Sequence, residues 1–262
     1  MLEAAVFLCG AVIMVIELAG SRVLAPFLGT SLAVWTSLIG IILAAMSLGA
    51  WWGGRLADRR PEPRLLSRII LLAGACTAAM ALTKGLALSF LQHQGAGLYA
   101  LAVAAALVLF APPALLLGMV APFAVRLRLN DPAHGGRVAG TLYALSSLGS
   151  IAGTFLTGFV LIAVFGSQAV LWAAAALLVG LALVYGPDRR AAQAWVAGFA
   201  ALAAATWLPV TGVAALGERL GLREKADPTR IYSDESHYSY IGVHVPPDQP
   251  NVRQLYLDRL MH

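Results

Sequence analysis

The chain has 262 residues, of which 60% are hydrophobic and 12% are charged, and its mean hydropathy is +0.79. These values exclude a soluble globular domain and a disordered chain, and they are typical of a protein that crosses a membrane several times. The net charge of +5 would suit a nucleic-acid-binding protein, but most basic residues before Leu216 lie in three short loops. That distribution indicates membrane topology.

Seven apolar runs approach or exceed the roughly 18 residues that a membrane-spanning helix needs. They cover Leu2–Leu24, Ser31–Gly53, Ile69–Phe90, Gly97–Val125, Val138–Phe165, Gln168–Tyr185 and Ala191–Leu216. The prolines of the fourth run, Pro112, Pro113 and Pro122, predict a kinked or tilted helix. The seventh run is the weakest, and its sequence would also suit a helix that lies on the membrane surface.

The basic loops predict the orientation of the chain. They follow the second, fourth and sixth runs and contain Arg55, Arg59, Arg60, Arg64 and Arg68, then Arg126, Arg128 and Arg137, then Arg189 and Arg190. The positive-inside rule places these loops and the amino terminus in the cytoplasm. We therefore expect a multi-pass protein of the inner (cell) membrane, whose tail after Leu216 is extracytoplasmic if the seventh run crosses. The first run is too long for a cleavable signal peptide.

Glu17 is the residue that points most directly to function. It lies roughly 22 Å along the first predicted helix, where an unpaired carboxylate is expensive and is by default a functional group. Lys84 lies at a similar depth in the third run, and a Glu17–Lys84 pair would neutralise both charges. Arg22 is close enough to the far surface to reach water. We take Glu17, Arg22 and Lys84 as candidates for substrate binding or ion coupling; the alternative is an interfacial helix cap that Glu17 forms with Ser21 and Arg22.

Small residues predict where helices touch. Gly49 and Gly53 are four residues apart in the second run, and Gly149 and Gly153 have the same spacing in the fifth run. Each pair lies on one helix face, where it permits close backbone approach to another helix. Ordinary lipid-facing glycines are the alternative, because glycine is common in membrane helices.

The loop after the second run resembles a conserved cytoplasmic loop of major facilitator transporters, which has a Gly-x-x-x-Asp-Arg pattern. Gly54, Asp58 and Arg59 match it, and the loop falls between the second and third helices, as in that family. In physical terms, Asp58 beside arginines can cap a helix end and pair across a mobile helix interface. Six helices would correspond to one half of such a transporter.

A second resemblance covers the whole chain. Five pieces of the chain resemble fused major facilitator/spermidine synthase membrane proteins: Glu17–Arg22, Leu24–Pro26, Gly29–Ser31, Trp35 and Gly53–Asp58. In those proteins a helical membrane domain precedes a soluble domain of the spermidine synthase type. The resemblance implies polyamine chemistry and, for a complete synthase, decarboxylated S-adenosylmethionine as cofactor.

The composition changes sharply after Leu216, so we divide the chain into a helical domain (1–216) and a soluble tail (217–262). Alternation from Tyr238 to Val245 predicts a strand, a turn follows, and Val252–Asp258 predicts a second strand. This pair resembles the first hairpin of the spermidine synthase fold, although Ser239 stands where the synthases usually have Gln. The nucleotide-binding domain of the synthases does not follow, so we predict no catalytic residue and no cofactor site in this chain.

The sequence therefore predicts an all-α polytopic membrane protein, with about seven transmembrane helices that resemble half of a major facilitator transporter and a short β-hairpin tail. Our first hypothesis is the membrane domain of a spermidine-synthase-like (aminopropyltransferase-like) fusion protein, truncated and without catalysis by itself. The alternative is a half-size small-molecule or polyamine transporter that uses Glu17 as its coupling acid. The expected partners are the lipid bilayer, a polyamine or other small molecule and a second copy of the chain. Scattered histidines and Cys9 and Cys76, which lie inside apolar runs, predict no metal site, and no nucleic acid is expected.

Overall fold

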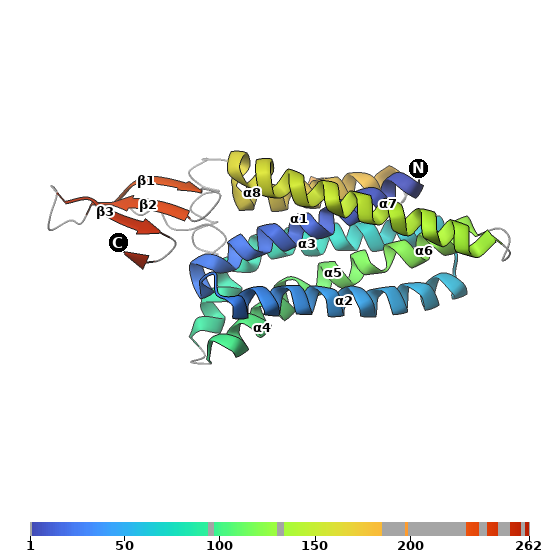
Figure 1. Cartoon of the computed structure of the whole chain (residues 1–262), viewed down its shortest axis with the longest axis horizontal. Helices are drawn as coiled ribbons and strands as arrows, with labels where there is room; N and C mark the ends of the chain where they lie inside the picture. Colours follow the sequence, from blue (N-terminus) through green and yellow to red (C-terminus); the bar gives the residue numbers. More distant parts are fainter. Residues whose placement is uncertain are drawn as a thin grey trace.

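The computed structural model describes residues 2–93, 97–129, 134–184, 197–198, 229–235, 240–245, 252–257 and 260–261. Its helices are α1 (Leu2–Leu28), α2 (Leu32–Arg59), α3 (Pro63–Gln92), α4 (Leu98–Leu109), α5 (Ala111–Gly118), α6 (Val120–Arg128), α7 (Gly135–Leu156), the π-helical turn Thr157–Leu161 and α8 (Ile162–Val184). They form an elongated bundle, and a small sheet lies beyond one end of it (Figure 1). The predicted seventh run lies outside the described residues, apart from 197–198.

Several helical segments are long and apolar enough to cross a membrane. Among the described residues these are α1, α2, α3 and the continuous stretch Gly135–Val184, and the bent segment α4–α6 can serve as a fifth. The bend of 50° between Leu98–Leu109 and Ala111–Arg128 falls where Pro112 and Pro113 remove two backbone donors. The described helices thus indicate a helical membrane protein, with the kink that the prolines predict in the fourth run.

The stretch Gly135–Val184 is two antiparallel segments. A straight helix of 50 residues would be about 75 Å long, far more than the hydrocarbon layer. Gly166 interrupts it with φ 74° and ψ 160°, a conformation that only glycine adopts without strain. After Gly166 the chain turns back along the bundle (Figure 1), so the predicted boundary between the fifth and sixth runs coincides with a real reversal.

Polar contacts define how α8 pairs with α3. Ser67 Oγ donates to the carbonyl of Ala182 at 2.7 Å, and Gln168 Nε2 donates to the carbonyl of Ala81 at 3.2 Å. The early part of α3 therefore faces the late part of α8, so the two helices are antiparallel. Gln92 Nε2 donates to the carbonyl of Phe27 at 2.7 Å, which shows that α3 and α1 run in the same direction and end side by side.

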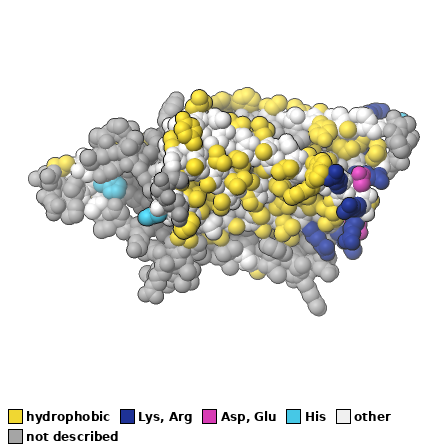
Figure 2. Space-filling model, turned by 90° about the horizontal axis from the view of Figure 1, so that it is seen from below, with side chains coloured by type: hydrophobic (Ala, Val, Ile, Leu, Met, Phe, Trp, Pro, Cys, Tyr) yellow, Lys and Arg dark blue, Asp and Glu magenta, His cyan; other side chains and the backbone are white. Residues whose placement is uncertain are grey.

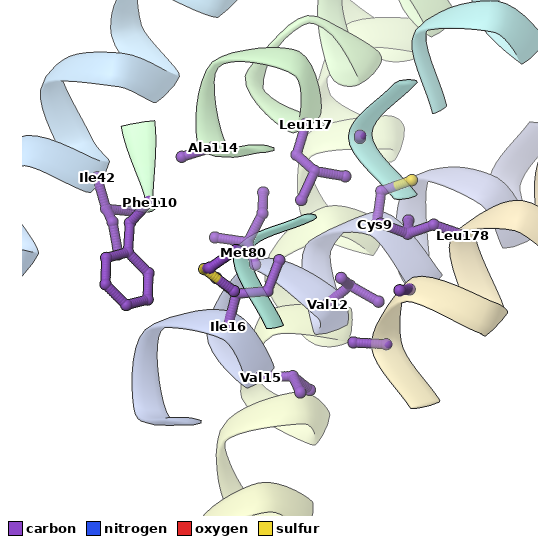
Figure 3. Packing of buried hydrophobic residues seen from close by; sticks show 14 of the residues in the cluster. Cys9, Val12, Val15, Ile16, Ile42, Met80, Phe110, Ala114, Leu117 and Leu178 are labelled. Carbon is purple, nitrogen blue, oxygen red and sulfur yellow. The ribbon is translucent and has the colours of Figure 1, made fainter. Parts of the chain in front are cut away.

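The core lies where α1, α3, α5 and α8 meet. Figure 3 shows Ile16 of α1 close to Met80 of α3, and Cys9 of α1 close to Leu178 of α8. The largest fully buried side chains are those of Phe110, at the junction of α4 and α5, and Phe123 of α6. Because lipid tails are as apolar as these side chains, tight packing stabilises such a bundle more than removal from water does.

The tail forms a four-stranded antiparallel sheet in the order β1-β2-β3-β4. Its strands are β1 (Arg230–Glu235), β2 (Tyr240–His244), β3 (Gln254–Leu257) and β4 (Leu260–Met261). The strands β2 and β3 fall within the two that the sequence predicts, whereas the turn between them and Ser239 lie outside the described residues. The prediction of a hairpin was too small, because β1 is polar and lacks the alternation that reveals β2. A hairpin alone is marginally stable, and the added strands pair with both of its edges.

Candidate functional site

A close contact of backbones joins α1 to α7; we call it the α1–α7 joint. A Cβ added at Gly149 would run into the carbonyl of Phe7, and one added at Gly153 would run into the backbone of Ala11. In return, a Cβ at Gly10 would meet the carbonyl of Ser146. Residue numbers rise together along both helices, so this pair is parallel.

A second contact, the α2–α5 joint, has the same construction. Gly49 faces the backbone of Leu115 and Gly53 faces that of Met119, while Gly118 of α5 faces Met46 of α2. In both joints one helix supplies two glycines four residues apart and the other supplies one. On the helix with the single glycine, the contacted residues lie three positions before that glycine and one position after it. On the helix with the glycine pair, the contacted residue lies three positions before the first glycine. The two joints therefore have the same sequence spacing: α7 corresponds to α2, and α1 corresponds to α4–α6.

A cavity of about 170 Å³ lies between the two joints. Residues of α1, α2, α5, α6 and α7 line it: Val6, Cys9, Gly10, Ile13, Met46, Ala50, Leu117, Gly118, Val120, Ala121, Pro122, Tyr143 and Ser146. Most of the lining is apolar, and the hydroxyls of Tyr143 and Ser146 are polar exceptions. Pro122 has no N–H to donate to the carbonyl of Gly118, so that oxygen loses its helical partner beside the cavity. The cavity thus combines an apolar wall with a few groups able to hold a polar ligand.

Glu17 lies next to this cavity along α1. Val6, Gly10 and Ile13 line the cavity, and Glu17 continues their stripe at the next helical turn, with spacings of four, three and four residues. The side chain of Glu17 is half-buried. One turn further, a Cβ at Gly20 would meet the ring of Phe110, at the α4–α5 break. The acid therefore lies between the cavity and the break in the fourth segment.

Arg22 and Lys84, the other two candidates within the membrane helices, do not line this cavity. Helix α1 continues to Leu28, and the Ser21 hydroxyl donates to the carbonyl of Leu18 at 2.8 Å, so the alternative of a helix cap around Glu17 is wrong. Arg22 is half-buried one turn after Leu18. The parallel ends of α1 and α3 put Glu17 and Lys84 at comparable depths. The ion pairs that the structure gives between described residues do not include Glu17, and its pairing with Lys84 stays a prediction.

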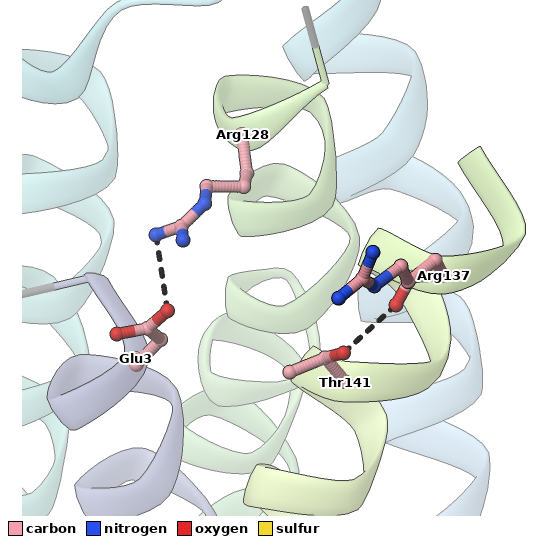
Figure 4. A network of polar contacts seen from close by, with 4 residues as sticks. All are labelled: Glu3, Arg128, Arg137 and Thr141. Carbon is pink, nitrogen blue, oxygen red and sulfur yellow. Dashed lines mark hydrogen bonds and ion pairs between the residues drawn. The ribbon is translucent and has the colours of Figure 1, made fainter. Parts of the chain in front are cut away.

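Two ion pairs join the end of α6 to the first two helices. Arg126 Nε lies 3.3 Å from Asp58 Oδ1, and Arg128 Nη1 lies 3.1 Å from Glu3 Oε1 (Figure 4). Asp58 lies in the last turn of α2, as Gly54 and Arg59 also lie in this helix and not in the loop that the sequence predicts, and it pairs across the α2–α6 interface. Arg59 is exposed, and no described atom lies within 4 Å of a Cβ added at Gly54. The sequence left the partner of Asp58 open, because nothing local connects positions 58 and 126.

Other chemistry is sparse in the part of the chain that the structure describes. It holds no group of three His, Cys, Asp or Glu side chains that could bind a metal ion. A second cavity, of about 480 Å³, lies between α2 and α4; its lining includes Leu32, Thr36 and Tyr99 but no charged residue. No protein-family model, curated protein or solved structure matches the chain. The site defined by Glu17 and the cavity between the joints is therefore the candidate that the geometry supports best.

Proposed function

We propose that this chain is the integral-membrane part of a protein of the fused major facilitator/spermidine synthase kind, and that its helices bind a small organic cation at Glu17. The position of Glu17 carries the proposal. A carboxylate one turn beyond an apolar cavity attracts a cation, and the cavity wall accepts the hydrocarbon part of the same molecule. A polyamine combines both features, and it is the ligand that the family resemblance implies.

The arrangement of helices supports the major facilitator part of the proposal. Counting α4–α6 as the fourth segment, α7 as the fifth and α8 as the sixth, the joints pair segment one with five and segment two with four. Exchanging the first three segments with the last three converts one joint into the other. Internal repeats of inverted orientation, with a binding site where they meet, are typical of secondary transporters. The cavity beside Glu17 is lined by helices of both repeats, that is, of segments one to three and of segments four to six.

Binding of spermidine to the purified chain in detergent, measured by isothermal titration, tests the proposal. We expect Glu17→Gln to weaken binding at least about tenfold, since a hydrogen bond to a charged group contributes about 1.5–3 kcal/mol and about 1.4 kcal/mol corresponds to a factor of ten. Glu62→Gln is the matched control, because Glu62 is an exposed acid in the α2–α3 loop and should leave the affinity unchanged. Equal affinity of the wild type and Glu17→Gln, with both proteins folded, would contradict the proposal.

Transport is the second candidate function, and the kink beside Glu17 favours it. Broken helices next to a membrane-embedded acid are a recurrent feature of proton- and ion-coupled transporters. Uptake of radiolabelled spermidine into liposomes that contain the chain, driven by a pH gradient, is the measurement. Uptake that Glu17→Gln abolishes supports coupling through this acid, and binding without uptake limits the helices to a binding function.

We place the protein in the cell membrane with the ends of α2, α3 and α6 that carry the arginines in the cytoplasm, according to the positive-inside rule. The tail is then extracytoplasmic if run 191–216 crosses. A reporter active only outside the cytoplasm, fused after His262, should be active. Activity of a cytoplasmic reporter at the same site would reverse this placement of the tail.

The four-stranded sheet supports the synthase part of the proposal, because it is an antiparallel sheet placed after the helices, as in the resembling proteins. Aminopropyl transfer needs a pocket that aligns the sulfonium carbon of decarboxylated S-adenosylmethionine with a deprotonated amine. We expect this chain by itself, incubated with that donor and putrescine, to form no spermidine above the blank. Spermidine formation that disappears when residues 229–262 are deleted would assign the activity to the tail.

A further inference from the structure

The last turns of α2 expose two tryptophans and two arginines on one face, which we call the Trp–Arg patch: Trp51, Trp52, Arg55 and Arg59. Trp51 is 52% exposed and Trp52 is 47% exposed, and both arginines are exposed. The spacings of three and four residues place the four side chains next to one another on the helix surface. The opposite face of the same turns is buried through Gly49, Gly53 and Ala57, so the patch points away from the bundle.

Within the patch, Arg55 is held in a defined position. Its guanidinium carbon lies 3.5 Å from the centre of the Trp51 ring, and the Trp52 ring lies 6.4 Å from that of Trp51, centre to centre. A guanidinium over an aromatic ring is attracted by the ring quadrupole and keeps its N–H groups available at its edge. The stack therefore presents a positioned set of donors whose geometry suits a phosphate.

The charges around the patch leave it strongly positive. Asp58 and Glu3 are used by Arg126 and Arg128 in the two ion pairs described above. Further exposed arginines lie at the same end of the bundle: Arg60, Arg64, Arg68 and Arg137. Figure 2 shows the basic side chains gathered at one end, beside the broad hydrophobic surface. In the described part of the chain, Glu62 is the only acid at this end outside those ion pairs.

We propose that the Trp–Arg patch binds the phosphate headgroup of an anionic phospholipid. Tryptophan is enriched at the depth of lipid headgroups, and clustered arginines beside a membrane helix attract anionic lipids. The same face of α2 continues into the bilayer with the exposed side chains of Leu48 and Ala44, on which an acyl chain can lie. Headgroup donors and an apolar track thus follow one another along a single helix face, in the order that a phospholipid requires.

Native mass spectrometry of the purified chain, titrated with phosphatidylglycerol or phosphatidylcholine, tests the proposal. We expect a bound phosphatidylglycerol population that Arg55→Ala and Trp51→Ala each reduce about fivefold, because one arginine near the surface contributes roughly that factor. Arg137→Ala is the matched control: it removes an exposed arginine of the same end that the patch does not include, and it should leave the population nearly unchanged. Arg55→Lys keeps the charge but not the planar stack, and it should give an intermediate loss.

Three outcomes would overturn the proposal. Equal losses from Arg137→Ala and Arg55→Ala would mean that only the overall charge attracts the lipid. Equal binding of phosphatidylcholine would show that the headgroup charge is not recognised. Displacement of the lipid by millimolar inorganic phosphate would identify a site for free anions. Circular dichroism of each variant establishes that it is folded, and Arg55→Lys keeps the test decisive if Trp51→Ala does not fold.

Discussion

The α1–α7 joint and the α2–α5 joint solve the same packing problem in the same way. In each, two glycines of one helix and one glycine of the other let the two backbones meet directly, at matching positions. Without side chains between them, the helices approach closely and gain dispersion contacts along the whole interface, which is the main source of stability inside a bilayer. Their common geometry shows that these glycines serve the fold.

The residues that differ between the joints are the ones with other roles. Ser150 corresponds in position to Ala50, and only the serine donates a hydrogen bond, to the carbonyl of Gly10 at 3.1 Å. Glu17, seven residues after Gly10, corresponds to Val125, seven after Gly118. Phe159, ten residues after Gly149, corresponds to Arg59, ten residues after Gly49. The contrast separates the glycines, which both joints share, from Glu17 and Arg59, whose counterparts Val125 and Phe159 are uncharged.

The largest effect is expected from filling the glycine contacts. Gly149→Ala and Gly49→Ala should each lower the free energy of unfolding by about 1–3 kcal/mol, because the new Cβ meets a backbone carbonyl that cannot rotate away. The measurement is equilibrium unfolding with sodium dodecyl sulfate in mixed micelles. Similar losses at both joints would sharpen the comparison, and a loss at only one would break it.

The controls for these variants are glycines with open space. No described atom lies within 4 Å of a Cβ added at Gly54 or Gly158, so Gly54→Ala and Gly158→Ala should not destabilise the protein. Alanine is the better helix former by up to about 1 kcal/mol, which can even give a small gain. Losses as large as those at Gly49 and Gly149 would show that helix position, and not contact, determines the effect.

A smaller effect is expected from the hydrogen bond that only the α1–α7 joint has. Ser150→Ala should cost about 0.5–1.5 kcal/mol in the same unfolding experiment, since the Gly10 carbonyl loses its additional donor. In the other joint Ala50 already stands at this position, so the variant makes the joints more alike. An unchanged free energy of unfolding would mean that the serine adds nothing to a contact made by glycines.

The smallest effect is expected from the ion pair between Asp58 and Arg126. Their side chains are 73% and 43% exposed, and exposed pairs contribute about 0.2–1 kcal/mol. A double-mutant cycle of Asp58→Asn and Arg126→Gln measures the coupling, which should fall further at high salt. A coupling well above this range would show that this ion pair has a larger part in joining α2 to α6 than the exposure of its side chains suggests.

The sequence by itself determined the class of protein and many boundaries, because these depend on local properties. Apolar length reveals membrane helices, prolines reveal the kink in the fourth segment, and alternation reveals β2 and β3. The four-residue spacing of Gly49 and Gly53 shows that they share a helix face. The strand β1 was missed because its partner, and not its own pattern, makes it a strand.

Only the tertiary structure decided which surfaces meet. A helix face of small residues can pack on any close neighbour, and the sequence does not say that α5 covers Gly49 or that α1 covers Gly149. Nor does it show that the stripe ending at Glu17 borders a cavity, or that Arg126 is the partner of Asp58. Contacts between residues a hundred positions apart depend on how all helices fill the bundle together, and packing of this kind leaves no local pattern in the chain.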